Sequence, residues 1–112
     1  MSAKRVVRRA TAEEDFRRAV VYYRDVGGKP LAHRFTDAIQ ATYRLIGRFP
    51  GAGSSRYEFE FGFEALRSRL VRGFPYIVFY SEGPNEIQVW RVLHAERDIL
   101  AELGDTELES DQ

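Results

Sequence analysis

The sequence has no cysteine, only two histidines and only two lysines among its 112 residues. Without cysteine, the chain can form no disulfide, no thiolate metal site and no cysteine nucleophile. The two histidines, His33 and His94, are too few for a multi-histidine metal site, so we expect no metal. No apolar run approaches the roughly 20 residues that span a membrane, and the basic start MSAKRVVRRA leads into no apolar signal segment. We therefore expect a cytoplasmic protein without a membrane partner.

Familiar catalytic and nucleotide-binding motifs are also missing. The sequence contains no GxxxxGK[ST], GxGxxG, HExxH or GxSxG segment. Ser54, Ser55 and Ser68 have no histidine–aspartate pair near them in the sequence. The residues by themselves therefore indicate neither a cofactor nor a nucleophilic catalytic site.

The composition indicates one packed domain with an uneven charge. Hydrophobic residues make up 44% of the chain and aromatic residues 13%, and we place a single domain at residues 1–103 with a flexible acidic tail at 104–112. Five acids and no base lie from Glu102 onward, so residues 1–101 carry an excess of about five positive charges. Arginine supplies 15 of the 17 basic residues. This suits carboxylate or phosphate binding, but arginine-rich codon usage explains it equally well.

The first half of the chain predicts an edge strand followed by a helical hairpin. Residues 4–9, KRVVRR, are β-branched at their centre, as strands are. Thr11 and Glu14 have the spacing of a capping box that starts a helix. The Gly-Gly pair at 27–28 ends this helix, and Pro30 starts the next. Apolar stripes at helical spacing mark the two helices: Phe16, Ala19, Val20 and Tyr23, then Leu31, Phe35, Ala38, Thr42, Leu45 and Ile46.

The second half changes to period two. Residues 57–64, YEFEFGFE, alternate aromatic residues with acidic residues or glycine, and we assign them no role. Residues 65–71, 74–80 and 86–93 predict three strands joined by short turns, which gives an antiparallel meander. Because 74–80 is apolar on both faces, it should lie at the centre of the sheet.

A short third helix follows His94, with Ile99, Leu100 and Leu103 at helical spacing. The predicted order is β-α-α-β-β-β-(α). This is an α+β fold in which the helical hairpin packs on one face of a small, mainly antiparallel sheet.

Arginines on the predicted strands are the main candidates for binding. Arg67 and Arg69 project from one face of their strand, and with Arg72 and Arg91 they could form a basic sheet surface that holds phosphate. Arg91 interrupts an otherwise apolar row and must be paired or open onto a cleft. The alternative is that Arg67 and Arg69 are solvated and that Arg91 pairs with Asp98. The row that Arg91 interrupts is Ile87, Val89 and Leu93.

His94 and three aromatic residues allow similar alternatives. His94 could act as a general acid–base, but a lone histidine at a strand end more often bonds the backbone and caps the following helix. Trp90, Tyr76 and Tyr80 could stack on nucleic-acid bases. Their positions on sheet faces favour core packing.

Taken in order, these segments resemble the RelE/ParE superfamily of toxins from bacterial type II toxin–antitoxin modules. The resemblance covers residues 11–100. It rests on the order strand, helical hairpin and meander, and on the segments Phe49-Pro50-x-x-Gly53, Leu66-Arg67, Tyr76-Ile77-Val78-Phe79-Tyr80, Arg91-Val92-Leu93-His94 and Arg97-Asp98. It implies a growth-inhibiting toxin that a cognate antitoxin neutralises.

The resemblance leaves two targets open. RelE-like members are ribosome-dependent mRNA endoribonucleases, and in that case Arg67, Arg91 and His94 match the positions for charge stabilisation and acid–base work. ParE-like members poison DNA gyrase without being enzymes. The ParE-like segments RVLHAERDI and FPYIVFY, and the lack of a lysine-rich surface, favour the ParE branch. On that reading we expect no catalytic residues.

The same resemblance implies a partner protein. Antitoxins of this superfamily fold on the toxin, often as an amphipathic helix on the helical hairpin. We expect a ParD-like antitoxin with a DNA-binding domain, held in a toxin–antitoxin hetero-oligomer. Its predicted landing surface is the exposed side of the hairpin, with Arg17, Arg24, Arg34 and Arg44.

Overall fold

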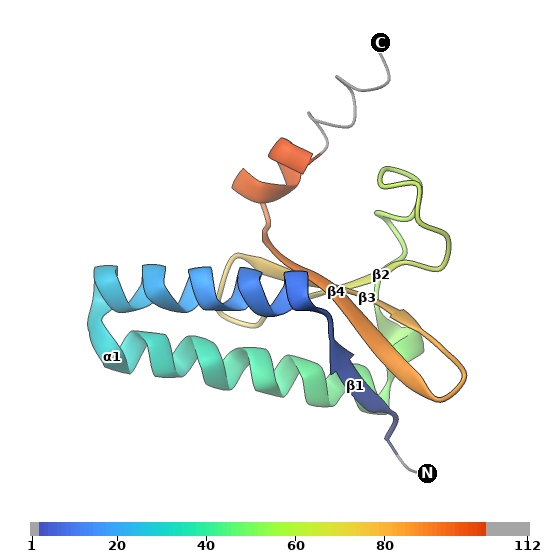
Figure 1. The fold of residues 1–112 in the computed structure, drawn as a ribbon, viewed down its shortest axis with the longest axis horizontal. Helices are drawn as coiled ribbons and strands as arrows, with labels where there is room; N and C mark the ends of the chain where they lie inside the picture. The colour runs from blue at the N-terminus through green and yellow to red at the C-terminus, as the bar shows by residue number, and fades with distance from the viewer. Residues whose placement is uncertain (1–2, 103–112) are drawn as a thin grey trace.

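The computed structural model of the chain describes residues 3–102. A helical hairpin covers one face of a four-stranded sheet (Figure 1). A short helical segment at residues 97–102, here called the terminal helix, follows the last strand. The predicted α+β class is confirmed; the elements are β1 (Arg5–Arg8), α1 (Ala10–Arg48), the 3-10 turn η1 (Pro50–Ala52), β2 (Arg67–Leu70), β3 (Tyr76–Glu82) and β4 (Glu86–His94).

The hairpin is formed by the two halves of α1, which run antiparallel to each other (Figure 1). Gly28 separates them with φ of 79° and ψ of −179°, a conformation that only glycine adopts without strain. Pro30 lies just after this break, where the first turn of the second half has no use for its missing N–H. The predicted Gly-Gly break and the proline restart are therefore both observed.

The predicted capping box at the start of α1 is wrong. The helix begins at Ala10, with Arg9 as the extended residue before it and no side-chain cap. Thr11 lies inside the first turn, and its hydroxyl donates to the carbonyl oxygen of Trp90 at 3.1 Å. Because β1 runs directly into α1, Thr11 lies past the start of the helix, and its hydroxyl bonds β4 instead of accepting from a helix N–H.

The strand order is β1-β4-β3-β2, which places β3 inside the sheet as predicted. β2, β3 and β4 form the antiparallel meander, and β1 pairs parallel to β4 at the edge. The five residues from Tyr76 to Tyr80 are all buried, because α1 covers one face of β3 and the segment at 55–65 covers the other.

A β-bulge in β4 changes which face of the sheet the side chains on either side of it point to. Val89 pairs with Tyr80 and Arg91 with Phe79, so Trp90 is an extra residue on this strand. The prediction that Ile87, Val89, Arg91 and Leu93 share one face is therefore wrong. Val89 and Val92 pack toward α1, whereas Leu93 packs on the opposite face of the sheet.

Two hydrophobic clusters lie on the two faces of the sheet. The larger one fills the space between the sheet and α1, and both predicted helix stripes contribute to it. Leu45 is an exception, because its side chain is 42% exposed. The smaller cluster lies on the other face, where Leu66, Ile77, Phe79, Leu93 and Ile99 are buried.

The aromatic and acidic segment covers this second face as a loop of turns. Tyr57, Phe61 and Phe63 pack against the smaller cluster, while Phe59 is 93% exposed. The period-two pattern therefore does not make a strand here. We call residues 55–65 the aromatic loop.

Of the predicted third helix, Ile99 is buried and Leu100 is 68% exposed. Leu103 and the predicted tail at 104–112 lie outside the described residues. No helix within residues 3–102 has the length and apolar character needed to cross a membrane.

Candidate functional site

Arg91, the most prominent candidate of the sequence, is held by an ionic cluster that joins three elements. Its Nε donates to Asp15 Oδ2 at 2.8 Å and its Nη2 to Asp15 Oδ1 at 3.2 Å. Its Nη1 donates to Glu102 Oε1 at 3.1 Å. Asp15 comes from α1 and Glu102 from the terminal helix, so one guanidinium ties both helices to β4.

Asp15 also completes the edge of the sheet. β1 ends beside Val89, and beyond that point β4 has no strand partner on this side. The N–H of Val92 donates to Asp15 Oδ2 at 3.0 Å instead. The Asp15 side chain is 6% exposed, whereas the Arg91 side chain is 33% exposed. The hydrogen bonds from Arg91 to Asp15 are the main reason that the pKa of Arg91 is raised.

The predicted Arg91–Asp98 ion pair is not formed. Asp98 instead accepts from the Nε of Arg97 at 3.0 Å and from the backbone N–H of His94 at 2.9 Å. Burial alone would raise the pKa of Asp98, but the hydrogen bonds from Arg97 and His94 together lower it. Asp98 therefore fixes the start of the terminal helix, while Asp15 takes the role that we expected of Asp98.

His94 caps the terminal helix. Its Nδ1 accepts from the backbone N–H groups of Glu96 at 3.2 Å and Arg97 at 3.1 Å. Its ring also contacts Tyr76 edge-on, with 5.4 Å between centroids. The structural interpretation of His94, a histidine that bonds the backbone at the joint between strand and helix, matches these contacts.

The three aromatic candidates for base stacking are engaged in packing. Tyr76 and Tyr80 are 3% and 0% exposed, so neither ring presents a face to a nucleic acid. The Tyr80 hydroxyl donates to the carbonyl oxygen of Pro50 at 2.7 Å. Trp90 is half-buried between Phe63 and the guanidinium of Arg9, and its Nε1 donates to Ser81 Oγ. Packing is thus the role that the structure gives to all three.

Arg67 and Arg69 lie on β2, and each is paired with a residue of β3 whose side chain faces α1. They pair with Tyr80 and Val78, which belong to the larger cluster. Arg67 Nη1 donates to the carbonyl oxygen of Gly53 at 3.0 Å. Arg72 is exposed in the turn after β2. Arg91 pairs with Phe79, whose side chain belongs to the smaller cluster on the other face of the sheet. The strand register therefore places Arg91 on a different face from Arg67 and Arg69.

The three residues that would serve a ribonuclease are also separated along the sheet. Arg67 pairs with Tyr80 and His94 pairs with Tyr76, at the two ends of a five-residue stretch of β3. The Cα atoms of Arg67 and His94 are offset by four residues along β3, which is about 13 Å, and by two strand spacings across the sheet, which is about 10 Å. The register therefore places Arg67 and His94 on different strands and at opposite ends of this stretch of β3.

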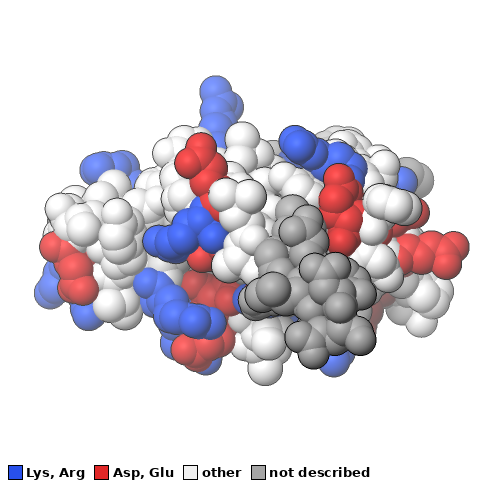
Figure 2. Space-filling view, turned by 90° about the horizontal axis from the view of Figure 1, so that it is seen from above, with Lys and Arg blue, Asp and Glu red and all other residues white. Residues whose placement is uncertain are grey.

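The four predicted antitoxin-binding arginines are all exposed on α1: Arg17, Arg24, Arg34 and Arg44. Arg17 forms a surface ion pair with Glu14 at 2.8 Å. Among the described residues, the other three arginines have no ion pair. Figure 2 shows separate groups of basic side chains over the part of the surface where α1 lies, with acidic side chains between them.

A hollow of about 350 Å³ lies between α1 and the terminal helix. Its lining includes the ionic cluster together with Arg18, Tyr22 and Arg97. Cations and anions alternate around it, and each buried charge already has a partner. In residues 3–102, no three histidine, aspartate or glutamate side chains lie close enough to hold a metal ion.

Comparison with known families identifies the chain. The sequence model of the family described as the ParE toxin of the type II toxin–antitoxin system, parDE, matches residues 6–99. This span runs from β1 into the terminal helix and makes up most of the chain. The chain belongs to the ParE toxin family.

A solved structure supports the same fold for this ParE-family chain. It is described as the chromosomal ParDE TA system from P. aeruginosa. The TM-score is 0.71, over 84% of this chain and 98% of that chain, with 16% sequence identity. At this identity the similarity concerns the fold alone. No curated protein matches the sequence.

Two features of this ParE-family chain escaped the sequence analysis. Asp15 was not recognised as the partner of Arg91, although it lies between Ala12 and Ala19 on the apolar face of its helix. An acid at such a position predicts a buried partner. The aromatic loop was recognised as a pattern, but its alternation gave no sign of which ring would remain exposed.

Proposed function

We propose that this protein is the toxin of a type II toxin–antitoxin pair, that it arrests growth by poisoning DNA gyrase, and that a cognate antitoxin neutralises it. The membership in the ParE toxin family carries this proposal. Members of that branch act through protein–protein contact, which requires surfaces and no catalytic residues.

The contacts of the three candidate catalytic residues favour gyrase over the ribonuclease alternative. Arg91 is paired with two carboxylates, and His94 Nδ1 is occupied by two backbone N–H groups. Arg67 lies at the far end of β3 from His94. A nuclease of this fold needs such groups to converge on one phosphate.

A supercoiling assay tests the choice of target. Purified gyrase and relaxed plasmid are incubated with increasing amounts of the protein, and supercoiled product is measured on gels. We expect inhibition with accumulation of cleaved plasmid, and filamentation with an SOS response after induction in cells. Normal supercoiling at excess protein, together with mRNA cut on translating ribosomes, would instead favour the ribonuclease.

The proposed antitoxin surface lies on the outer side of the first half of α1. Arg17, Val21 and Arg24 are spaced by four and three residues, so they lie on one helical face. Val21 is 45% exposed, and nearby Tyr22 and Val26 are 49% and 60% exposed. An exposed valine between two arginines on one helical face suits an amphipathic, acidic segment of an antitoxin with a ParD-like DNA-binding domain.

Charge reversal tests this surface. The product of the neighbouring reading frame is co-expressed with the toxin, and their complex is measured by co-purification and calorimetry. We expect Arg17→Glu with Arg24→Glu to weaken binding by roughly tenfold or more, because like charges then face each other. Arg72→Glu, an exposed reversal in the turn after β2, is the matched control and should bind normally. Equal binding by all three proteins would exclude this surface.

A further inference from the structure

The aromatic loop is the part of the chain that the antitoxin surface does not use. Three of its four aromatic rings are anchors that hold it on the sheet. Tyr57 and Phe61 contact the ring of Phe79, with centroids 5.3 and 5.6 Å away, and Phe63 contacts Trp90 at 5.3 Å. The fourth ring, Phe59, is 93% exposed. Three of the rings are therefore partly buried against the sheet, and the turns of the loop leave the fourth in solvent.

The backbone around Phe59 is closed by local hydrogen bonds. The N–H of Phe61 donates to the carbonyl oxygen of Tyr57 at 3.1 Å, and the N–H of Phe63 to that of Glu58 at 3.1 Å. Gly62, with φ of 62°, donates to the carbonyl oxygen of Phe59 at 3.2 Å. Since these bonds and the three anchors already order the loop, burying Phe59 against a partner would cost little additional conformational entropy.

The charge around Phe59 is opposite to that of the rest of the domain. Glu58, Glu60 and Glu64 lie in the loop, and none of them forms a salt bridge within residues 3–102. With Arg56, whose guanidinium lies over the ring of Tyr57, three acids and one base give the loop a net charge of −2. Figure 1 places this loop on the right-hand side of the molecule, above the turn that joins β3 to β4. Residues 1–101 as a whole carry an excess of about five positive charges.

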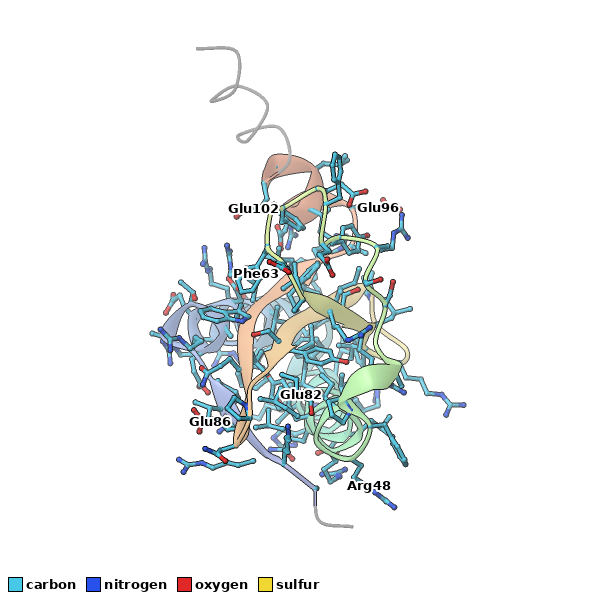
Figure 3. The ribbon with its side chains drawn as sticks, turned by 90° about the vertical axis from the view of Figure 1, so that its right-hand side faces the viewer. Arg48, Phe63, Glu82, Glu86, Glu96 and Glu102 are labelled. Atoms are coloured by element: carbon cyan, nitrogen blue, oxygen red, sulfur yellow. The ribbon has the colours of Figure 1, made fainter. Side chains whose placement is uncertain are left out.

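The loop also lies away from the proposed antitoxin surface. It covers the face of the sheet opposite to α1, and it approaches the terminal helix. Phe63 and Glu102 line one small hollow of about 160 Å³ there (Figure 3). An acidic antitoxin segment would be attracted to the arginines of α1 and repelled by the glutamates of the loop.

We propose that the aromatic loop is the surface through which this toxin engages its target, and that Phe59 inserts into an apolar pocket within a basic protein surface. The inference rests on the proposed function, since it assigns the target contact of a protein that acts by binding. An exposed, preorganised aromatic ring is the type of residue that dominates binding energy at protein interfaces. The three glutamates select a positively charged partner and disfavour direct contact with nucleic acid.

Truncation of the exposed ring is the first test. Phe59→Ala, Leu100→Ala and the unaltered protein are induced in cells, and growth arrest, gyrase inhibition and co-purification of the antitoxin are measured. We expect Phe59→Ala to raise the concentration needed for half-maximal gyrase inhibition by roughly tenfold or more and to relieve growth arrest. Leu100→Ala is the control, because Leu100 is similarly exposed at 68% but lies on the terminal helix.

Removal of the charges is the second test. The triple variant Glu58→Gln, Glu60→Gln, Glu64→Gln should bind the target more weakly at low salt, and the difference from the unaltered protein should shrink as salt screens the interaction. Glu96→Gln removes one exposed acid outside the loop and is the control. Antitoxin binding should be retained by every variant, which shows that the variants fold.

The outcomes separate this inference from the proposed function. If the unaltered protein arrests growth and Phe59→Ala arrests it equally, the loop is not the target surface and the inference fails alone. If growth stops while supercoiling stays normal, gyrase is the wrong target, and the growth phenotype of Phe59→Ala still decides the role of the loop. If the unaltered protein causes no arrest, both proposals fail.

Discussion

At the scale of single residues, Asp15 shows how much one buried acid can organise. Its carboxylate accepts two bonds from Arg91 and one from the N–H of Val92. It thereby neutralises a half-buried cation and replaces the strand partner that β4 lacks beyond Val89. Because the partner groups come from elements 76 residues apart, their loss should affect the fold as a whole.

We predict that Asp15→Ala destabilises the protein by about 3 kcal/mol, because Arg91 and the N–H of Val92 both lose their acceptor. Urea unfolding followed by circular dichroism measures the change. Asp15→Asn is the matched variant, since its amide oxygen can still accept from Val92, and it should lose less. A loss below about 0.5 kcal/mol for Asp15→Ala, the range of ordinary surface changes, would contradict the role assigned to this carboxylate.

Variants of His94 distinguish a structural role of this residue from a catalytic one. We predict that His94→Ala lowers the free energy of unfolding by about 1 kcal/mol, because two N–H groups of the terminal helix lose their cap. His94→Asn should recover part of the loss, since asparagine is a good capping residue. Urea unfolding and growth arrest are measured on the same variants. Growth arrest that persists in His94→Ala agrees with a capping role, whereas complete loss of toxicity in a folded variant would point to catalysis.

At the scale of elements, the hairpin depends on one residue of α1. Gly28 adopts φ of 79° and ψ of −179°, a backbone conformation that residues other than glycine cannot adopt without strain. We predict that Gly28→Ala costs about 1–3 kcal/mol in thermal or urea unfolding. Gly51→Ala is the control, because the structure leaves open space for its added methyl group. Equal stability of the two variants would show that the hairpin tolerates a different turn.

The elements themselves were largely predictable from the sequence. Apolar spacing located both halves of α1, and the apolar stretch at 74–80 located the central strand. These features depend on neighbours in the chain, which is why a local pattern reveals them. The failed capping box at Thr11 has a tertiary cause, because β4 supplies the acceptor that its hydroxyl uses.

The candidate site was less predictable, because it depends on contacts between distant residues. The bulge at Trp90 adds one residue to β4 and reverses the facing of those that follow it, and no spacing in the sequence marks it. The aromatic loop has a strand-like alternation, yet Gly62 and Ala65 have positive φ and interrupt it. Tertiary packing therefore decided both the partner of Arg91 and the exposure of Phe59.

At the scale of the whole molecule, buried tyrosines link the stability of the fold to alkaline pH. Tyr23, Tyr43 and Tyr80 all belong to the cluster between the sheet and α1. Burial raises the pKa of each above its ordinary value of 10, and that of Tyr43 reaches about 12. The cause is the same in all three, since a phenolate inside this cluster would lose its hydration.

The sign of the effect follows from these directions. Below pH 10 each phenol is protonated in both the folded and the unfolded chain, so the stabilisation is fully present. Between pH 10 and 12 the unfolded chain releases the Tyr43 proton while the folded chain retains it. The free energy of unfolding therefore falls as pH rises through this window, by up to about 2–3 kcal/mol for Tyr43 alone.

We predict that urea unfolding at a series of pH values will show a loss of stability that begins near pH 10. Tyr43→Phe should reduce the slope between pH 10 and 12, because its ring packs similarly but carries no ionisable proton. Unfolding of the same two proteins near pH 7, well below the ordinary pKa of a phenol, is the control for any effect of the substitution on packing. An identical slope in Tyr43→Phe and the unaltered protein would mean that Tyr43 does not link folding to pH in this range.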